Sequence, residues 1–516
     1  MGHALMQVGA VPVARAARSW PSYLAVALAA LVVRAVPFAW AGALTAQREY
    51  DDGVAFLGAR ALASGQLPYR DFVFLHPPGV LLAMLPFAGW GSGGDDAVRL
   101  AAARVAVVGL GAVNAVLVVR LLRPYGRVAM LVGGLGYAAW GAAASAERTV
   151  LLEPAINLGL LVALGLLQVR GRRLEVWAGA ALGLALAVKY WSVVDVAVLL
   201  LVVAARSRLR GVLRFAGGVA LGAGVVALPF FVAAPRQMWQ QTVVTQLGRP
   251  TQGVSIGERG AAFAPLAGLG APDGRVPGVL WMVALVVVVL LGLVPIMAAV
   301  RLRTPARQWP DEGWWAVVAL AHLGVLAVSA SFYYHYAAWA AAPLALVVGV
   351  LAQRLWNRVT VRGARAALAG AAAVAVVGVL AVVGARVWEA VGAPASSRAE
   401  VVAWSAGKQC VWGLAPQLVW ADAATRDVAH GCDVYADAYG ANLALGRSAD
   451  AAGLASNAAW GAAVGAQIAG ADGVLLPADP ASWPLDAARA AQVRRDFTLV
   501  GQTAGVSRWD RSASAG

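Results

Sequence analysis

Two adjacent carboxylates, Asp51 and Asp52, are the residues whose type and spacing point most directly to chemistry. They follow a long apolar segment, so they lie at the depth of lipid headgroups if that segment crosses a membrane. Mutual repulsion and partial desolvation would raise the pKa of one of them, which is how a general base could be prepared at a membrane surface. Spacing alone equally allows one Asp to cap a helix while the other is solvated.

A helix is expected directly after these carboxylates. The apolar residues there follow helical spacing: Val54, Leu57, Ala61 and Leu62. This pattern predicts an amphipathic helix that lies along the membrane surface, is capped by Asp51 or Asp52 and ends near Gly65. A second helix, at 79–89, follows a Pro-Pro pair and is too short to cross a bilayer.

Two basic residues stand within apolar segments, where a charge is costly unless it is paired or faces a polar cavity. Lys189 is the only lysine in the apolar part of the chain, so it is a candidate site residue. The alternative is that its side chain snorkels to the outer interface. For Arg34, a structural ion pair with Glu147 or another carboxylate is as compatible with its position as a substrate contact.

The composition says which elements must position these residues. Of 516 residues, 60% are hydrophobic and 13% are charged, which excludes a soluble enzyme, a disordered chain and a disulfide-dense miniprotein. A bilayer is crossed by roughly 20 apolar helical residues. Windows of that kind predict about eleven spans, at 22–42, 98–119, 128–143, 155–168, 176–190, 191–205, 215–233, 279–300, 313–330, 337–352 and 366–387.

The net charge of +15 comes from arginine, and its distribution gives an orientation rather than a nucleic-acid partner. The loop arginines fall in alternate loops: Arg120, Arg123, Arg127, Arg170, Arg172, Arg173, Arg206, Arg208, Arg210, Arg214, Arg301, Arg303, Arg307, Arg354, Arg358, Arg362 and Arg365. Cytoplasmic loops are enriched in Arg and Lys. We therefore predict a cytoplasmic tail at 1–20, a plasma-membrane region at 21–387 with an external loop at 43–97, and an extracytoplasmic domain at 388–516.

The last 129 residues lack long apolar runs and predict a small α/β domain. Helices are expected at 396–406, 450–469 and 486–495, and strands at 410–412, 432–435, 473–477 and 497–503. The chain's two cysteines, Cys410 and Cys432, both lie in this domain. Outside the cytoplasm they can form a disulfide; two buried free thiols are the alternative.

Four short motifs in the external loop occur together: Asp51-Asp-Gly53, Ala61-Leu-Ala-Ser-Gly65, Pro68-Tyr-Arg-Asp-Phe72 and His76-Pro-Pro-Gly79. Their combination resembles the first external loop of polytopic C-type glycosyltransferases. Within these it is most similar to the bacterial branch related to protein O-mannosyltransferases and the lipid A aminoarabinose transferase. Further similar segments follow in the family's order: 147–154, 183–191, 246–250 and 332–336.

This resemblance, over residues 20–350, implies an all-α polytopic fold and a polyprenyl-phosphate sugar donor. It assigns the catalytic base to Asp51, with Asp52 as neighbour and fallback. Candidates for binding the donor phosphate or substrate are Lys189, Arg249, His335, Tyr334, His76, Arg70, Glu147 and Glu153. Two alternatives to a binding role stay open. The aromatic turn at 332–336 could instead form part of an interfacial aromatic belt, and His76 could serve merely to cap the next helix.

We therefore predict a membrane hexosyl- or pentosyltransferase that moves a sugar, with inversion, to a hydroxyl of an extracytoplasmic glycan, lipid or protein. No cofactor or metal is expected; a divalent cation at Asp51 and Asp52 is the less favoured alternative. The sequence contains no phosphate-binding Gly-x-x-x-x-Gly-Lys-Ser/Thr loop and no His-Glu-x-x-His motif. The rival functions are a transporter or lipid flippase without glycosyl transfer, and a structural membrane protein with an external binding domain.

Overall fold

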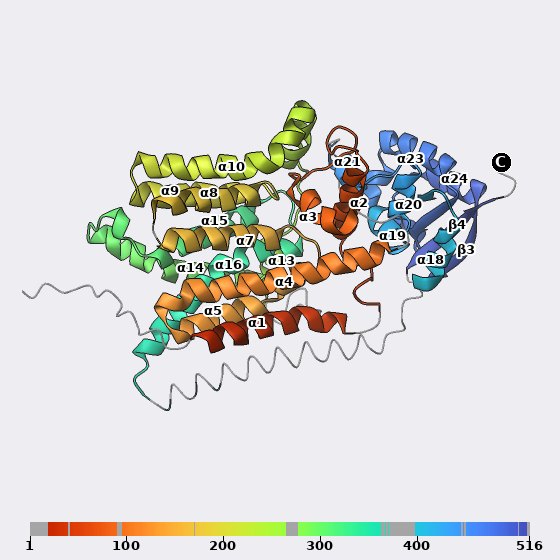
Figure 1. The fold of residues 1–516 in the computed structure, drawn as a ribbon. Helices are drawn as coiled ribbons and strands as arrows, with labels where there is room; N and C mark the ends of the chain where they lie inside the picture. The colour runs from red at the N-terminus through yellow and green to blue at the C-terminus, as the bar shows by residue number, and fades with distance from the viewer. Residues whose placement is uncertain are drawn as a thin grey trace, which may run out of the picture.

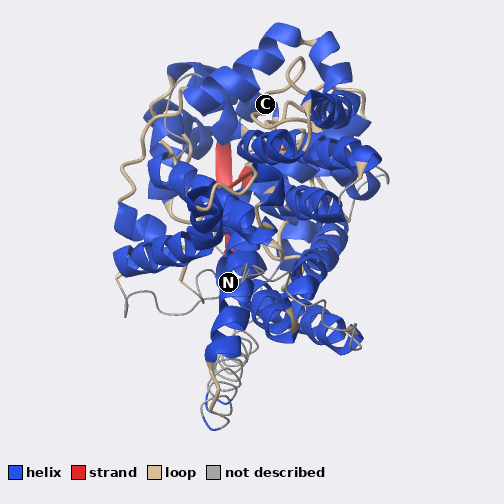
Figure 2. Cartoon of the chain, turned by 90° about the vertical axis from the view of Figure 1, so that its left-hand side faces the viewer, coloured by secondary structure: helices blue, strands red, loops and turns tan. Residues whose placement is uncertain are grey.

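The computed structural model of this chain describes residues 19–39, 42–89, 95–169, 171–264, 277–361, 363, 367, 370, 398–444, 447, 450–503 and 505–512. Figure 1 shows two parts, a bundle of long helices lying side by side and a smaller unit that covers one end of it. The smaller unit, residues 398–512, is the C-terminal domain, and we call the end of the bundle that it covers the domain end. In Figure 2, which faces the opposite end, helices fill the foreground and strands are visible behind them.

Ten bundle helices coincide with ten of the eleven predicted spans. They are α1 (Trp20–Ala35), α4 (Asp96–Leu122), α5 (Arg127–Ala139), α7 (Glu153–Val169), α8 (Arg172–Leu186), α9 (Ser192–Arg206), α10 (Leu209–Ala233), α14 (Gly278–Arg301), α15 (Asp311–Val328) and α16 (Ala337–Arg358). The predicted spans at 176–190 and 191–205 are two separate helices, α8 and α9. The predicted span at 366–387 lies outside the described residues except for residues 367 and 370.

Within the described residues, six helical segments are long and apolar enough to cross a membrane: Trp20–Phe38, Asp96–Tyr125, Leu209–Ala233, Gly278–Arg301, Asp311–Val328 and Tyr334–Arg358. The remaining four bundle helices have 13 to 17 residues, so the count of eleven spans stays a prediction. Large apolar side chains such as Leu221 on α10 and Leu290 on α14 are more than half exposed, which suits contact with lipid.

Small residues let the bundle helices approach closely. Between α8 and α10, a Cβ at Gly179 would lie 2.1 Å from the carbonyl oxygen of Phe215, and a Cβ at Gly218 would lie 2.1 Å from that of Val176. Such contacts replace the hydrophobic driving force that is missing between helices in lipid. In α16, alanines on most sides of the helix are buried, and this helix lies at the centre of the bundle core.

Shorter elements connect the long helices. They are η1 (Val36–Phe38), α2 (Tyr50–Ala63), α3 (Gly79–Ala88), η2 (Arg123–Tyr125), α6 (Gly141–Ala146), α11 (Pro235–Trp239), the π-helical turn η3 (Gln240–Val244), α12 (Thr245–Leu247), α13 (Ile256–Ala261), η4 (Ala306–Gln308) and η5 (Tyr334–Tyr336).

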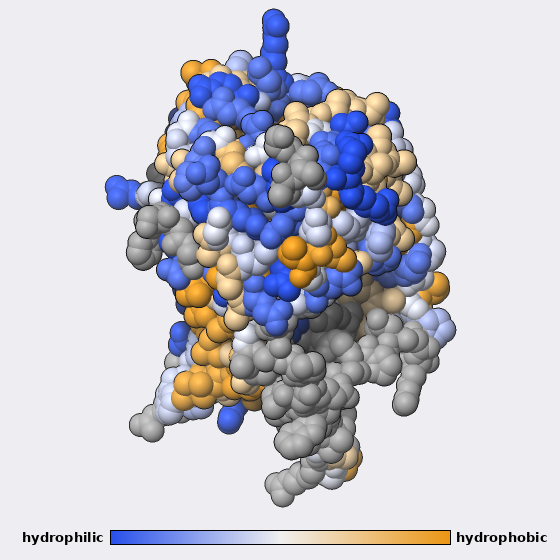
Figure 3. Space-filling view, turned by 90° about the vertical axis from the view of Figure 1, so that its right-hand side faces the viewer, coloured by the Kyte–Doolittle hydropathy of each residue, from blue (hydrophilic) through white to orange (hydrophobic). Residues whose placement is uncertain are grey.

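The C-terminal domain is α/β, as predicted. Its sheet has the order β1-β2-β4-β3, in which β1 (Val411–Trp412) is parallel to β2 (Gly473–Pro477), and β4 (Val506–Arg511) is antiparallel to β2 and to β3 (Phe497–Thr503). The helices are α18 (Arg398–Ala406), α19 (Ala415–Trp420), α20 (Ala424–Ala429), α21 (Ala438–Ala444), α22 (Ala451–Ala455), α23 (Ala458–Gly470) and α24 (Ala487–Asp496), with a turn η6 (Pro480–Ser482). The outer face of this domain is largely hydrophilic (Figure 3).

Two predicted elements of this domain are wrong. Residues 432–435 form no strand, because the segment is tied to the start of β1 by a disulfide and makes no ladder with it. The helix predicted at 450–469 is divided into α22 and α23, because the Asn457 side chain accepts hydrogen bonds from the backbone N–H groups of Ala459 and Trp460 and so starts a new helix. Strand β4 was not predicted.

Helix α2 connects the two parts. It packs against α3 on one side and against α19 and α20 of the C-terminal domain on the other. A Cβ at Gly53 would lie within 2.6 Å of the backbone of Pro416 in α19, so only glycine permits this approach. Nine of the fourteen residues of α2 are buried. The predicted cap is wrong: the helix begins after Glu49, and neither Asp51 nor Asp52 caps it. The position of the helix along the membrane surface stays a prediction.

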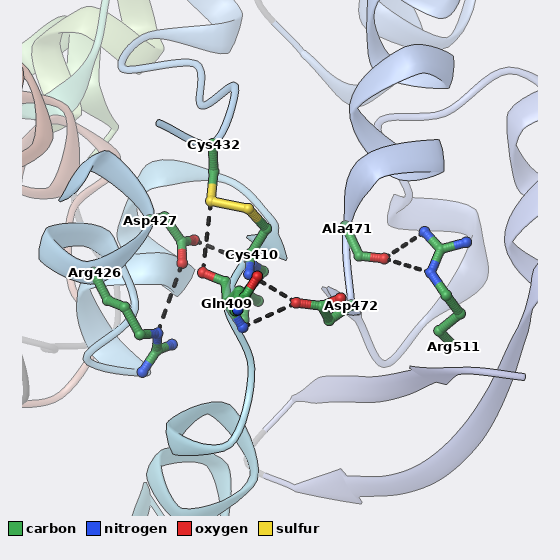
Figure 4. The surroundings of a disulfide bond; sticks show 9 residues. Gln409, Cys410, Arg426, Asp427, Cys432, Ala471, Asp472 and Arg511 are labelled. Atoms are coloured by element: carbon green, nitrogen blue, oxygen red, sulfur yellow. Dashed lines mark hydrogen bonds and ion pairs between the residues drawn. A yellow bond between two sulfur atoms is a disulfide. The ribbon is translucent and has the colours of Figure 1, made fainter. Parts of the chain in front are cut away.

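The predicted disulfide between Cys410 and Cys432 is present, with a Cα–Cα distance of 5.7 Å (Figure 4). The Asp472 carboxylate accepts hydrogen bonds from the backbone N–H groups of Gln409 and Cys410, which fixes the chain on one side of the bridge. On the other side, the Cys432 backbone N–H donates to the carbonyl of Asp427 at the end of α20. The bridge thus holds the chain after α20 against the start of β1.

We predict that replacing both cysteines by serine lowers the free energy of unfolding of the C-terminal domain by about 3 kcal/mol, because a loop of roughly 20 residues is no longer closed in the unfolded chain. Equilibrium denaturation of the full-length protein, followed by tryptophan fluorescence, measures the loss. Wild-type protein treated with dithiothreitol should match the double variant. Equal stability of the double variant and the oxidised wild type would contradict the prediction.

Candidate active site

Polar residues from four separate segments meet at the domain end of the bundle. Asp51 comes from the first turn of α2, Lys189 from the turn after α8, Glu153 from the first residue of α7 and His335 from η5. The charges of Lys189 and Glu153 both act on Asp51, and those of Lys189, Arg249 and His335 act on His76. The fold therefore brings six of the residues chosen from the sequence into one cluster, which we call the junction site.

Asp51 is a largely buried carboxylate with neither a hydrogen bond nor an ion pair to any other described residue. The pKa of Asp51 is raised to about 7, chiefly by burial and then by the negative charge of Asp437, whereas the positive charge of Lys189 opposes the shift. A carboxylate with this pKa is half protonated near neutral pH. It can therefore accept a proton from a bound hydroxyl group and release it afterwards.

Asp52 has a different environment, although it is the next residue. Its Oδ2 atom lies 2.6 Å from Nη2 and 3.0 Å from Nε of Arg104 on α4. Its Oδ1 atom accepts a hydrogen bond from the backbone N–H of Val150. Both side chains of the pair are at most 2% exposed. All the acceptor positions of Asp52 thus face protein, and Asp52 holds α2 against α4.

Lys189 is paired and held between aromatic rings. Its Nζ atom lies 2.5 Å from Oε1 of Glu153 and 4.3 Å from the ring centres of Trp191 and Tyr336. The side chain is buried, which excludes the alternative of snorkelling to the interface. The pair brings one positive and one negative charge to the site at fixed positions.

Several buried polar atoms of the junction site have no partner. Glu153 Oε2, His335 Nδ1 and Arg249 Nε make no hydrogen bond to any described residue. Buried polar groups are nearly always satisfied, so three such atoms in one cluster indicate that a ligand or water completes them. Burial and the positive charges of Lys189 and Arg249 lower the pKa of His76 well below its usual range, so His76 is a neutral hydrogen-bonding group.

Tyr334 lies at the rim of the junction site. Its hydroxyl group donates a hydrogen bond to Oε1 of Glu49, the residue before α2. Burial raises the pKa of Glu49, and the negative charge of Asp52 adds to the rise. The Tyr334 side chain is 41% exposed, so it can contact a ligand that enters from outside the bundle.

Two residues chosen from the sequence are not in the junction site. Arg70 is exposed and forms an ion pair with its neighbour Asp71, with 2.7 Å between Nη2 and Oδ2. Glu147 is buried in the bundle, where Arg34 forms an ion pair with it and Asn114 and Tyr137 donate hydrogen bonds to it. Of the two interpretations of Arg34, the structure supports the structural ion pair. Neither Arg70 nor Glu147 is available to a ligand at Asp51.

The sequence did not point to some of the polar residues that the fold places here. Asp437 comes from the C-terminal domain, and Tyr50 donates a hydrogen bond to it. Tyr336 and Trp191 enclose Lys189 and contact each other, with ring centres 4.4 Å apart. Trp191 could have been chosen from the sequence because it is an aromatic residue near a lone lysine, and Tyr336 because it belongs to an aromatic turn. Nothing in the sequence connects Asp437 with Asp51.

No metal site is evident in the described part of the chain, where no group of three or more His, Cys, Asp or Glu side chains could hold an ion. A small cavity of about 10 Å³ is lined by Glu49, Asp52, Gly53, Arg104 and Trp420 among others. Asp51 is not among its lining residues, so this cavity is not the junction site.

Comparison with known proteins gives two similarities. Residues 74–329 match the model of glycosyltransferase family 87. The crystal structure of ArnT from Cupriavidus metallidurans bound to undecaprenyl phosphate has a TM-score of 0.53 and 16% sequence identity, covering 97% of this chain and 99% of that one. The apo structure of the same protein has a TM-score of 0.49 and 18% identity, covering 96% and 99%. No curated protein matches the sequence.

These findings confirm the resemblance that the sequence predicted, to polytopic C-type glycosyltransferases. The fold is that of ArnT, and with its long apolar helices the chain is a multi-pass membrane protein. The family match includes His76, Glu153, Lys189 and Arg249 but begins after Asp51. The roles of the individual residues stay predictions.

We predict that Asp52→Asn lowers the free energy of unfolding by about 3 kcal/mol, because it leaves the Arg104 charge buried without a counter-ion. Asp51→Asn should not lower the stability, since Asp51 has no partner to lose and its raised pKa means that burial already disfavours its charge in the folded state. Unfolding of the purified protein by sodium dodecyl sulfate in mixed micelles measures both. Equal effects of the two substitutions would show that the Asp52–Arg104 pair is not structural.

Proposed function

We propose that this protein is an inverting membrane glycosyltransferase that moves a sugar from a polyprenyl-phosphate donor to a hydroxyl group of an extracytoplasmic acceptor. The family match and the fold support a membrane glycosyltransferase. The undecaprenyl phosphate bound to ArnT supports a lipid phosphate as carrier. The observation that carries the mechanism is Asp51, a largely buried carboxylate without a partner whose pKa is about 7.

In this mechanism Asp51 accepts the proton of the acceptor hydroxyl group. The hydroxyl oxygen forms a bond to the anomeric carbon on the face opposite the phosphate, and the bond from that carbon to the phosphate oxygen breaks. The phosphate leaves with the electron pair. The anomeric configuration is therefore inverted. A base with a pKa near the ambient pH is efficient because about half of it is unprotonated while it is still basic enough to accept the proton.

The leaving phosphate would be bound by the positive and neutral donors of the junction site. Arg249 and His335 each present a buried nitrogen atom without a partner. Lys189 adds a positive charge that Glu153 holds in place. Charge-assisted hydrogen bonds to phosphate are about twice as strong as neutral ones, and donors fixed before the reaction stabilise the charge that develops.

The position of the site in the bundle fits a lipid-linked donor. The junction site lies at the domain end, whereas α4, α9, α14 and α16 end in arginine-containing turns at the opposite end of the bundle (Figure 1). By the positive-inside rule, those turns face the cytoplasm and the junction site and C-terminal domain face the other side. The lipid tail would stay in the bilayer while the phosphate and sugar reach Asp51.

The rival function, transport of a lipid or solute without chemistry, has one observation in its favour. Asp195 on α9 and His322 on α15 form a hydrogen bond inside the bundle, with 2.6 Å between Oδ1 and Nε2, and both side chains are fully buried. Ionisable residues at this depth mark transport pathways in many membrane proteins. Here Trp339 stacks on His322 and its indole N–H donates to Asp195, so aromatic packing encloses the pair.

We predict that Asp51→Asn reduces kcat for sugar transfer by about a factor of 1,000, because an amide cannot accept the proton. Transfer of radiolabelled sugar from polyprenyl-phosphate mannose, glucose or arabinose to extracted envelope glycans and lipids, with the protein in liposomes, measures the loss. Arg70→Gln is the matched control on the same loop and should keep wild-type activity. A fully active Asp51→Asn variant would refute Asp51 as the base.

We further predict that Lys189→Gln weakens the binding of undecaprenyl phosphate about tenfold or more, because one charge-assisted contact to the phosphate is lost. Inhibition of transfer by added undecaprenyl phosphate gives the constant, and a direct titration by tryptophan quenching gives it without turnover. Lys408→Gln, at the other lysine of the chain, is the control and should bind as the wild type does. Unchanged binding in Lys189→Gln would place the phosphate elsewhere.

A further inference from the structure

A loop of the C-terminal domain places a second carboxylate beside Asp51. Asp437 directly precedes α21, and its side chain is only 9% exposed. Its Oδ1 atom accepts hydrogen bonds from the Tyr50 hydroxyl group at 3.2 Å and from the backbone N–H of Gly440 at 2.8 Å. Asp437 thus binds the residue that immediately precedes Asp51 in the first turn of α2.

Tyr50 makes a second contact with the same loop. Its hydroxyl oxygen accepts a hydrogen bond from the backbone N–H of Tyr439 at 3.2 Å, and its ring centre lies 4.6 Å from that of Tyr439. The phenol is therefore both donor and acceptor to one loop of the C-terminal domain. Since Tyr50 and Asp51 share a helical turn, fixing Tyr50 also fixes the backbone that carries Asp51.

The loop itself is held at two points. The disulfide ties Cys432, five residues before Asp437, to the start of β1. After Asp437, a Cβ at Gly440 would lie 2.0 Å from Oδ2 of Asp437, so the glycine leaves room for the carboxylate to turn towards α2. Contacts within the C-terminal domain thus fix the position of Asp437, independently of its contact with the bundle.

We propose that Asp437 is a positioning residue for the base Asp51, so that the docked C-terminal domain completes the active site. This inference rests on the proposed function for the role of Asp51. It assigns to the C-terminal domain a part in the reaction: Asp437 orients the first turn of α2 through Tyr50 and places a negative charge next to the base.

The electrostatic surroundings of Asp51 agree with this role. The ionisable groups whose charges act on it come from several separate segments: Asp437, Lys189, Glu153 and Glu49, with the phenols of Tyr50, Tyr333 and Tyr336. After burial, the charge of Asp437 is the largest cause that raises the pKa of Asp51, and the charge of Lys189 opposes it. Without Asp437, the balance moves towards Lys189, and the pKa of Asp51 falls.

The test measures protonation of Asp51 directly and needs no substrate. Full-length protein in liposomes is treated with a hydrophobic carbodiimide, which modifies protonated carboxyl groups, between pH 5 and 9. Mass spectrometry of the peptide containing Asp51 gives the pH at which labelling is half-maximal. In the wild type we expect this midpoint near 7.

Asp437→Asn and Asp437→Ser both remove the charge and should lower the labelling midpoint of Asp51 by about one pH unit. Asp437→Glu keeps the charge and should return the midpoint towards the wild-type value. The control is Asp433→Asn, an exposed carboxylate in the same loop, which should not move the midpoint. Thermal unfolding identifies any variant that fails to fold. If one of the two charge-removing variants does not fold, the other still provides the test.

A midpoint that is the same in the wild type and in the folded Asp437→Asn or Asp437→Ser variant would overturn the inference. In transfer assays with the sugar donors above, the acid limb of the pH–rate profile should move to lower pH in the same variants. If the labelling midpoint moves but no donor is turned over by any variant, the effect of Asp437 on Asp51 stands and the proposed function fails. The two failures are thus distinguishable.

Discussion

The buried ion pair between Asp52 and Arg104 is the interaction on which the arrangement of the junction site depends. The Arg104 guanidinium binds the Asp52 carboxylate and also donates to the carbonyl groups of Leu44 and Ala46 in the segment before α2. The same carboxylate accepts the N–H of Val150, just before α7. One charged pair therefore joins α2 and α4 to the segments that immediately precede α2 and α7. Because an unpaired charge at this depth is very costly, the register of α2 is fixed, and with it the direction of Asp51.

The bundle could be predicted because long apolar runs determine membrane helices with little help from tertiary contacts. Each of the ten predicted spans within the described residues has a helix, and α8 and α9 are separate because the chain turns at Lys189. The candidate site was accessible for the same reason: Lys189 and the Asp pair are polar exceptions in apolar surroundings. The sequence could not predict which of the two adjacent aspartates forms an ion pair, because the partner, Arg104, is about fifty residues away.

Several of the errors share one physical cause, which is contact between distant segments. Helix α2 was expected to be amphipathic because its sequence has an apolar stripe, but the C-terminal domain covers its other side and approaches Gly53 through Pro416. Glu147 was a candidate because its segment resembles an external loop of the family; its partners Arg34, Asn114 and Tyr137 satisfy it. Asp437 could not be found at all, because 386 positions separate it from Asp51 and its own loop contains no motif.

The charges of the junction site also suit the proposed reaction as it proceeds. A sugar linked to a polyprenyl phosphate is a phosphodiester with one negative charge, and the phosphate that leaves gains a second. Asp51 loses its negative charge when it accepts the proton from the acceptor. The sum within the site is then unchanged, so the fixed charges of Lys189, Glu153 and Arg249 need no rearrangement during transfer. In this proposal the step moves negative charge away from Asp437 and Glu49, which disfavour it at Asp51, and onto the phosphate that Lys189 and Arg249 would bind. The same repulsion that gives Asp51 its affinity for a proton thus drives charge towards the leaving group.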